Sequence, residues 1–250
     1  MAHNQQPTET FSSIYSRLTS HSSPLLPPST PHSRALTSQI AALQLHPTLE
    51  SALHILNADL VSAHFLLRHM QSPPAWEGMF LHGILHRIEG DYDNARMWYS
   101  DVAKDESESD ENIYENVWGN VRGDDGGEQG MDGKGKTFKD LGEGIKEVKF
   151  SERKEYGWGG SKERELDAGQ RFLNAVQAFK ETKAALRNEE VGKRLQVESK
   201  REIETAVEWC ERKFGSEKWE DAREAWVVNG EEVAKASDAM LRGDKGTRKF

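Results

Sequence analysis

The feature that most constrains this sequence is the stretch Trp76–Val102, in which two helical segments are joined by a Gly-Asp turn. Apolar residues recur every three or four positions over Met79–Ile88, a spacing that predicts a helix with one buried stripe. Gly90 reaches left-handed dihedral angles at little cost and so ends that helix, while Asp91 can cap the next one by accepting a backbone hydrogen bond. Helices joined by so short a turn lie antiparallel. The stretch therefore predicts a helical hairpin.

The residues around this turn follow the pattern of a known repeat. The matching positions are Gly83 in the first helix, Gly90, Asp91, Tyr92, Asp93, Asn94 and Ala95 at the turn, and Tyr99 and Val102 in the second helix. This pattern resembles the second half of a tetratricopeptide repeat. A weaker copy lies 32 residues upstream, where Asp59–Ala63 precede Phe65–Leu67 and the first helix is predicted at Thr48–Leu56. The resemblance implies an all-α fold of tetratricopeptide-like antiparallel hairpins, which bind a helix or an extended peptide of a partner on their concave face.

Residue usage divides the chain into regions. All nine histidines and all eight prolines lie within residues 1–86, and the first lysine is Lys104. Residues 1–33 are rich in Ser, Thr and Pro, which predicts a disordered arm. Residues 34–103 form the hairpin region, and residues 104–165 are acidic and then glycine-rich, which predicts a disordered linker or insertion. Residues 166–230 are predicted to form C-terminal helices that pack on the hairpins, and residues 231–250 a charged tail.

The C-terminal region carries its own helical pattern. Phe172, Leu173, Val176 and Phe179 predict one helix from about Leu166 to Leu186, and a longer helix is predicted at Glu189–Phe214, ending at Gly215. A last short helix is expected around Trp219–Val227. Within the linker, Ile113, Tyr114, Val117 and Trp118 predict a brief amphipathic helix that docks back on the body.

Composition excludes several classes of protein. The net charge of −9 argues against nucleic-acid binding, which depends on clustered cations. The single cysteine, Cys210, leaves no intrachain disulfide and favours a reducing compartment. Apolar runs fall short of the roughly 18 residues of a membrane span, and the N-terminus does not follow the pattern of a secretory signal. The sequence therefore predicts a protein of the cytoplasm or nucleus without a membrane partner, and it leaves the oligomeric state open.

Three residues of the central hairpin pose a chemical question. His82, His86 and Glu89 lie at positions i, i+4 and i+7 and so share one face of the first helix. Two imidazoles and a carboxylate at that spacing can hold a divalent metal such as zinc or iron, or carry out acid–base catalysis. The sequence favours the structural alternative, in which both histidines occupy packing positions of the repeat and bond Tyr99, Asp91 or a backbone carbonyl. The sequence assigns His64 and His69, five residues apart, to surface or interface roles.

Two functions therefore follow from the sequence. The leading hypothesis is a non-catalytic helical module that binds a protein or peptide. By the repeat resemblance its partner-binding residues are Glu77, Phe80, Ile84, Arg87 and Ile88, although these side chains can equally pack against the C-terminal helices. The alternative is a small metal-dependent or acid–base enzyme centred on His82, His86 and Glu89.

Overall fold

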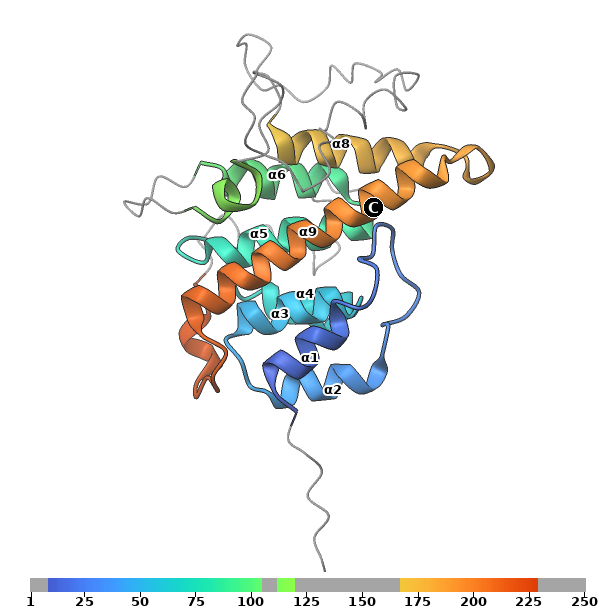
Figure 1. The fold of residues 1–250 in the computed structure, drawn as a ribbon. Coiled ribbons are helices and arrows are strands. Elements are labelled where there is room, and N and C mark those ends of the chain that lie inside the picture. The colour runs from blue at the N-terminus through green and yellow to red at the C-terminus, as the bar shows by residue number, and fades with distance from the viewer. Residues whose placement is uncertain (1–8, 105–111, 120–166, 229–250) are drawn as a thin grey trace, which may run out of the picture.

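The computed structural model describes residues 9–104, 112–119 and 167–228, and every regular element within them is helical. Eight helices lie along this part of the chain, with three short helical turns between and after them (Figure 1). The helices are α1 (Phe11–Leu18), α2 (Arg34–Ala42), α3 (Pro47–Leu56), α4 (Leu60–Leu67), α5 (Trp76–Glu89), α6 (Tyr92–Val102), α8 (Ala168–Glu181) and α9 (Glu189–Phe214). The turns are η1 (Glu115–Gly119), η2 (Ala184–Leu186) and η3 (Ala222–Ala225). The prediction of an all-α fold is confirmed.

The central hairpin forms as its sequence predicts. Gly90 ends α5 with a left-handed φ of 88°, and the Asp91 side chain caps α6 by accepting a hydrogen bond from the Asn94 amide at 3.3 Å. The two helices approach so closely that a Cβ at Gly83 would lie 2.6 Å from Cδ1 of Tyr99. Glycine at this position thus lets the backbone of α5 pack directly on the Tyr99 ring.

The preceding hairpin, α3 and α4, repeats this turn with different residues. Asp59 caps α4 through a hydrogen bond from the Ser62 amide at 3.2 Å, as Asp91 caps α6. The position equivalent to Gly90 is Ala58, which adopts a left-handed φ of 57°. Helix α4 ends at Leu67, so it is shorter than its counterpart α6. The four helices α3, α4, α5 and α6 thus form two successive antiparallel pairs.

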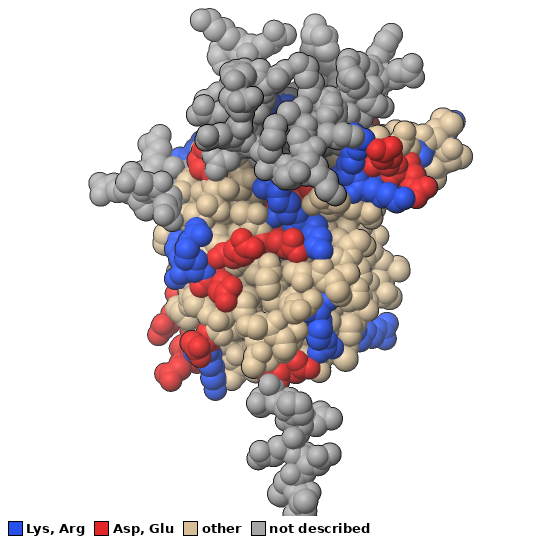
Figure 2. Space-filling model, viewed as in Figure 1, with Lys and Arg blue, Asp and Glu red and all other residues tan. Residues whose placement is uncertain are grey.

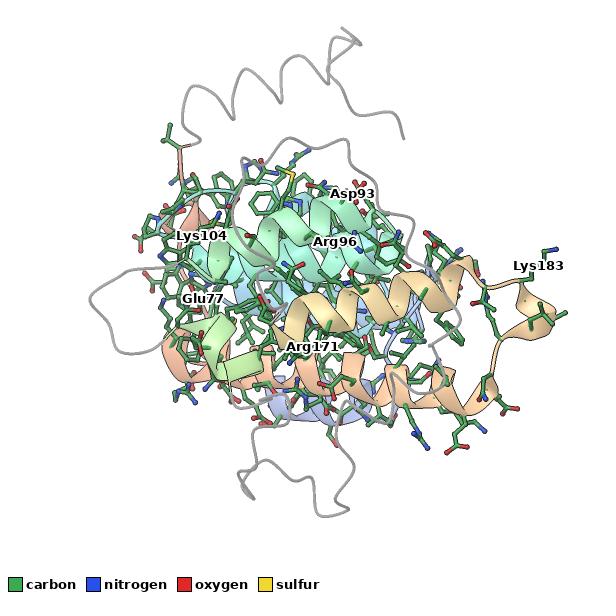
Figure 3. All side chains as sticks on the ribbon, turned by 90° about the horizontal axis from the view of Figure 1, so that it is seen from above. Glu77, Asp93, Arg96, Lys104, Arg171 and Lys183 are labelled. Atoms are coloured by element: carbon green, nitrogen blue, oxygen red, sulfur yellow. The ribbon has the colours of Figure 1, made fainter. Side chains whose placement is uncertain are left out.

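The C-terminal helices close over these hairpins. Helix α8 packs on α6, and the long helix α9 crosses both α3 and α5 (Figure 1). The bounds of α9 are those predicted, whereas the predicted helix Leu166–Leu186 is described from Ala168 and ends at Glu181. The described segment 112–119, which contains η1, buries the four apolar residues predicted to dock there, Ile113, Tyr114, Val117 and Trp118. Arg96 of α6, labelled in Figure 3, donates to Asn174 and Gln177 of α8 and so joins the two layers.

The prediction of a disordered arm over residues 1–33 is wrong from α1 onward. Phe11, Ile14 and Leu18 are buried, and α1 contacts α2 and α3. Thr10 and Ser13 cap its first turn reciprocally. Leu25, beyond the helix, is also buried. The abundant serines and threonines hid three apolar positions at helical spacing and a capping pair, and these provide the burial and amide bonding that a short helix requires. Residues 1–8 lie outside the described part of the chain, as do 105–111, 120–166 and 229–250, where the linker and tail predictions fall.

Candidate functional site

The five residues predicted to bind a partner lie inside the molecule. Glu77, Phe80, Ile84, Arg87 and Ile88 are all buried, four of them completely. Helix α9 covers this face of α5, so the alternative interpretation of the sequence applies and the prediction of a partner surface at these residues is corrected. The physical reason is that α9 carries its own apolar stripe together with polar groups that match those of α5.

The matching polar groups form a buried network around Arg87. Its Nη2 atom donates to Oε2 of Glu202 at 2.6 Å and to Oγ of Ser199 at 3.1 Å, and Tyr99 Oη donates to the other oxygen of Glu202. Burial alone would lower the pKa of Arg87, but the charge of Glu202, the charge of Tyr99 and the hydrogen bonds with both residues together outweigh it and raise that pKa, so the guanidinium stays charged. Burial raises the pKa of Glu202, and the adjacent guanidinium limits this rise. Removing either partner therefore leaves the other as an unpaired buried charge.

Glu77, labelled in Figure 3, ties the start of α5 to the end of α9. Its Oε1 atom accepts from Nε1 of Trp209 at 2.9 Å and from Nζ of Lys213 at 2.7 Å. On the outer face of α9, acidic and basic residues alternate over the surface in view (Figure 2). The polar bonds of α9 with α5 are thus internal, and its exposed face carries charges of both signs.

A different face of α5 carries a histidine cluster, which we define as His64, His82 and His86. His64 comes from α4 and the other two from α5, and each offers a nitrogen such that all three atoms lie within 4.8 Å of one another. The rings of His82 and His86 are stacked with centroids 4.9 Å apart, and the His64 ring meets both edge-on, at 5.0 Å and 5.6 Å. The structure therefore brings together two predicted residues and one, His64, that the sequence assigned to a surface role.

Glu89 completes this arrangement from the end of α5. Its Oε2 atom lies 3.2 Å from Nδ1 of His86, and its Oε1 atom lies 3.7 Å from Nδ1 of His64. Burial would raise the pKa of Glu89, but hydrogen bonds from His64 and His86 and the charges of the two rings outweigh it and lower this pKa to about 2. The carboxylate is therefore ionised at neutral pH and spans two imidazoles from different helices.

The neighbouring side chains hold the cluster in place. Asn94 Nδ2 lies 3.1 Å from Nε2 of His86 and donates to Oδ2 of Asp91 at 3.3 Å. The Trp98 ring stacks on His82 with centroids 4.8 Å apart and planes inclined by 8°. The bonding partners proposed for His86 from the sequence were Tyr99, Asp91 or a carbonyl. In the structure, His86 instead contacts Asn94 and Glu89, and Tyr99 donates a hydrogen bond to Glu202.

An exposed apolar surface lies beside the cluster on α4. We call it the α4 strip, and it consists of Val61, Phe65, His69, Trp226 and Val228. Seven large apolar side chains are exposed in the described residues, and four of them belong to this strip. Phe65 meets the His69 ring edge-on, His69 stacks on Trp226 at 4.6 Å, and the Val227 amide donates to the His69 carbonyl at 3.0 Å. Phe65 and Trp226, far apart in sequence, thus meet on the two sides of His69, which spacing along the chain could not reveal.

Comparison with protein-family models, with curated proteins and with solved structures finds no match to this chain. The tetratricopeptide resemblance therefore remains a prediction from the residues of the central hairpin. Among the helices of the described residues, none combines the length and the apolar character needed to cross a bilayer.

Proposed function

We propose that this protein is a helical binding module that docks an apolar segment of a partner protein on the α4 strip. The observation that supports it is the clustering of exposed apolar side chains there: Val61 is 83% exposed, Phe65 55% and Val228 96%. Contiguous apolar patches are uncommon on soluble domains unless they bind something. The strip is therefore the surface of the described chain best suited to a partner.

The charges beside the strip define the partner more closely. The Arg68 guanidinium lies 4.4 Å from the centre of the Phe65 ring, so a cation flanks the largest apolar side chain of α4. Apolar anchors surrounded by complementary charges are the usual arrangement of a binding hot spot. The partner segment accordingly carries apolar anchors next to an acidic residue.

The repeat resemblance supports a binding role, but it predicts a binding face other than the α4 strip. Tetratricopeptide hairpins bind on the face that includes Phe80 and Ile84, which α9 fills in this chain. A partner therefore binds the outer side of the first hairpin instead, where α4 and the C-terminal residues meet. This relocation keeps the leading function and changes the residues that perform it.

Site-specific crosslinking tests this proposal. Benzoylphenylalanine placed at Phe65 is expected to give a discrete crosslinked product in cells, and the Val61→Asp change is expected to suppress it. The matched control places the same crosslinker at Met97, which is 52% exposed on α6 outside the strip. Equal products from positions 65 and 97, or a product from position 65 that Val61→Asp leaves unchanged, would contradict the proposal. A product of twice the chain mass would identify a second copy of this chain as the partner.

A further inference from the structure

We propose that His64, His82, His86 and Glu89 form a binding site for one divalent transition metal of the zinc class. This site is independent of the α4 strip and goes beyond the binding of a protein partner. Its donors come from two helices, α4 and α5, whose residues are 18 or more positions apart in sequence.

The donor atoms already lie near the separations that a metal imposes. Zinc holds nitrogen and oxygen ligands at about 2.0–2.1 Å in a tetrahedron, which places neighbouring donors about 3.3 Å apart. Glu89 Oε2 lies 3.2 Å from His86 Nδ1, and Glu89 Oε1 lies 3.7 Å from His64 Nδ1. The three imidazole nitrogens lie within 4.8 Å of one another. The imidazole nitrogens must therefore come closer together than they lie here when an ion binds.

His64 is the imidazole of this cluster whose side chain has the most room to move. His64 is 42% exposed and stands on α4, a helix of eight residues, whereas His82 and His86 are buried on α5. A rigid pair on one helix and an adjustable third donor on another allow the ligands to close around an ion without repacking the core. The Asn94 and Trp98 contacts hold the two α5 rings in position meanwhile.

The chemistry of the donors selects the metal. Imidazole nitrogen binds zinc, copper, nickel and cobalt, whereas magnesium and calcium take oxygen ligands. Three imidazoles and one carboxylate give four protein donors, which suits tetrahedral zinc. A site with four protein donors ties the helices that supply them, so the ion would join α4 to α5 next to the α4 strip.

Metal titration of the purified full chain tests the site. After removal of metal by chelation, Zn²⁺ is titrated by calorimetry in competition with a chromophoric chelator, and Co²⁺ is added separately to read the geometry. We expect one ion per chain with micromolar or tighter affinity, the intense visible absorption of tetrahedral Co²⁺, and a melting temperature that rises by several degrees with Zn²⁺.

Variants assign the ion to these residues. His64→Ala and Glu89→Gln alter half-exposed side chains and so are expected to keep the helical circular dichroism while weakening Zn²⁺ binding at least about 10-fold. His21→Ala, which removes a histidine stacked on His32 away from the cluster, is the control and is expected to bind as the wild type does. Absence of binding at 1:1 stoichiometry, or equal affinity in His64→Ala and His21→Ala, would show that the cluster is a purely structural set of histidines.

Discussion

On each of two faces of α5 a carboxylate is paired with cationic or imidazole groups, and this carboxylate comes from α9 on one face and from α5 itself on the other. On the α9 side, Arg87 and Glu202 are completely buried, and their atoms lie 2.6 Å apart. On the α4 side, Glu89 is 34% exposed and lies 3.2 Å and 3.7 Å from two imidazoles. The Arg87–Glu202 pair joins α5 to α9 and is closed to solvent, whereas the Glu89 contacts are partly open to solvent.

The difference shows how burial sets the role of a charged residue. A completely buried pair cannot exchange its partner for water, so it fixes the position of α9 on α5 and leaves no room for a ligand. Glu89 and His64 are partly exposed, so water competes for their mutual contact and that contact stabilises the fold little. Residue type alone, a glutamate beside basic groups, does not distinguish the two.

The largest expected effect comes from breaking the buried pair. Glu202→Gln leaves the Arg87 guanidinium charged and buried, which is expected to lower the free energy of unfolding by about 3–5 kcal/mol. Denaturant unfolding at pH 7 measures this change. The double variant Arg87→Met with Glu202→Leu removes both charges and is expected to recover most of the loss. A loss of less than about 1 kcal/mol in Glu202→Gln would mean that the two faces of α5 do not differ as the burial indicates.

A third buried polar group, His46, sharpens the comparison because its neighbour is a cation. Its ring stacks on Phe214 at 3.7 Å and meets Trp219 edge-on. Burial, with a smaller contribution from the charge of Lys213, lowers the pKa of His46 from 6.5 to about 4. The unfolded chain therefore binds this proton first as the pH falls.

Stability is accordingly expected to fall as the pH drops from about 6.5 to about 4 and to lose nothing further from this group below pH 4. A shift of this size corresponds to about 3 kcal/mol. Denaturant unfolding across this range, compared with His46→Leu, isolates the contribution, because the variant lacks it while retaining every other histidine. Parallel curves for the two proteins would contradict the prediction.

A medium effect is expected from Asn94, which bonds one member of the histidine cluster. Asn94→Ala removes the contact with His86 Nε2 and the bond to Asp91, and Asn94 is buried. The expected loss is about 1 kcal/mol in metal-free protein. In the same variant, weaker Zn²⁺ binding than wild type would show that Asn94 also positions His86. Unfolding in the presence of chelator and metal titration separate the two effects.

The local elements of this fold could be predicted from the sequence because their signals lie within a few residues of one another. The turn at Gly90, the cap at Asp91, the burial of Ile113–Trp118 and the limits of α9 all follow from spacing and capping residues. The helix α1 was missed because its three apolar residues lie in a segment whose overall composition is that of a flexible arm. Composition averaged over 33 residues concealed an eight-residue helix.

The candidate site could be predicted only in part, for a related reason. His82, His86 and Glu89 share a helix, so their proximity follows from helical geometry. His64 lies on α4, and its place beside them depends on how two hairpins pack, which no spacing within the chain specifies. The same limit applies to the residues predicted to bind a partner. The sequence indicates that the apolar side chains of α5 are buried, but it does not specify whether α9 or another protein buries them.

The smallest expected effect comes from making the same substitution on the other face of α5. Glu89→Gln, like Glu202→Gln, removes one carboxylate charge, but Glu89 is about one-third exposed and its partners are imidazoles rather than a guanidinium. Water can solvate His64 once the charge is gone, and no buried guanidinium is left unpaired. An ion pair of this kind contributes about 0–1 kcal/mol, and the free energy of unfolding in the presence of chelator is expected to change by less than about 1 kcal/mol. Paired denaturant curves of Glu89→Gln and Glu202→Gln measure the contrast directly. Equal losses in the two variants would show that the histidine cluster, like the Arg87 pair, serves to hold the fold together, whereas a small loss accompanied by weakened Zn²⁺ binding is the result expected of a ligand.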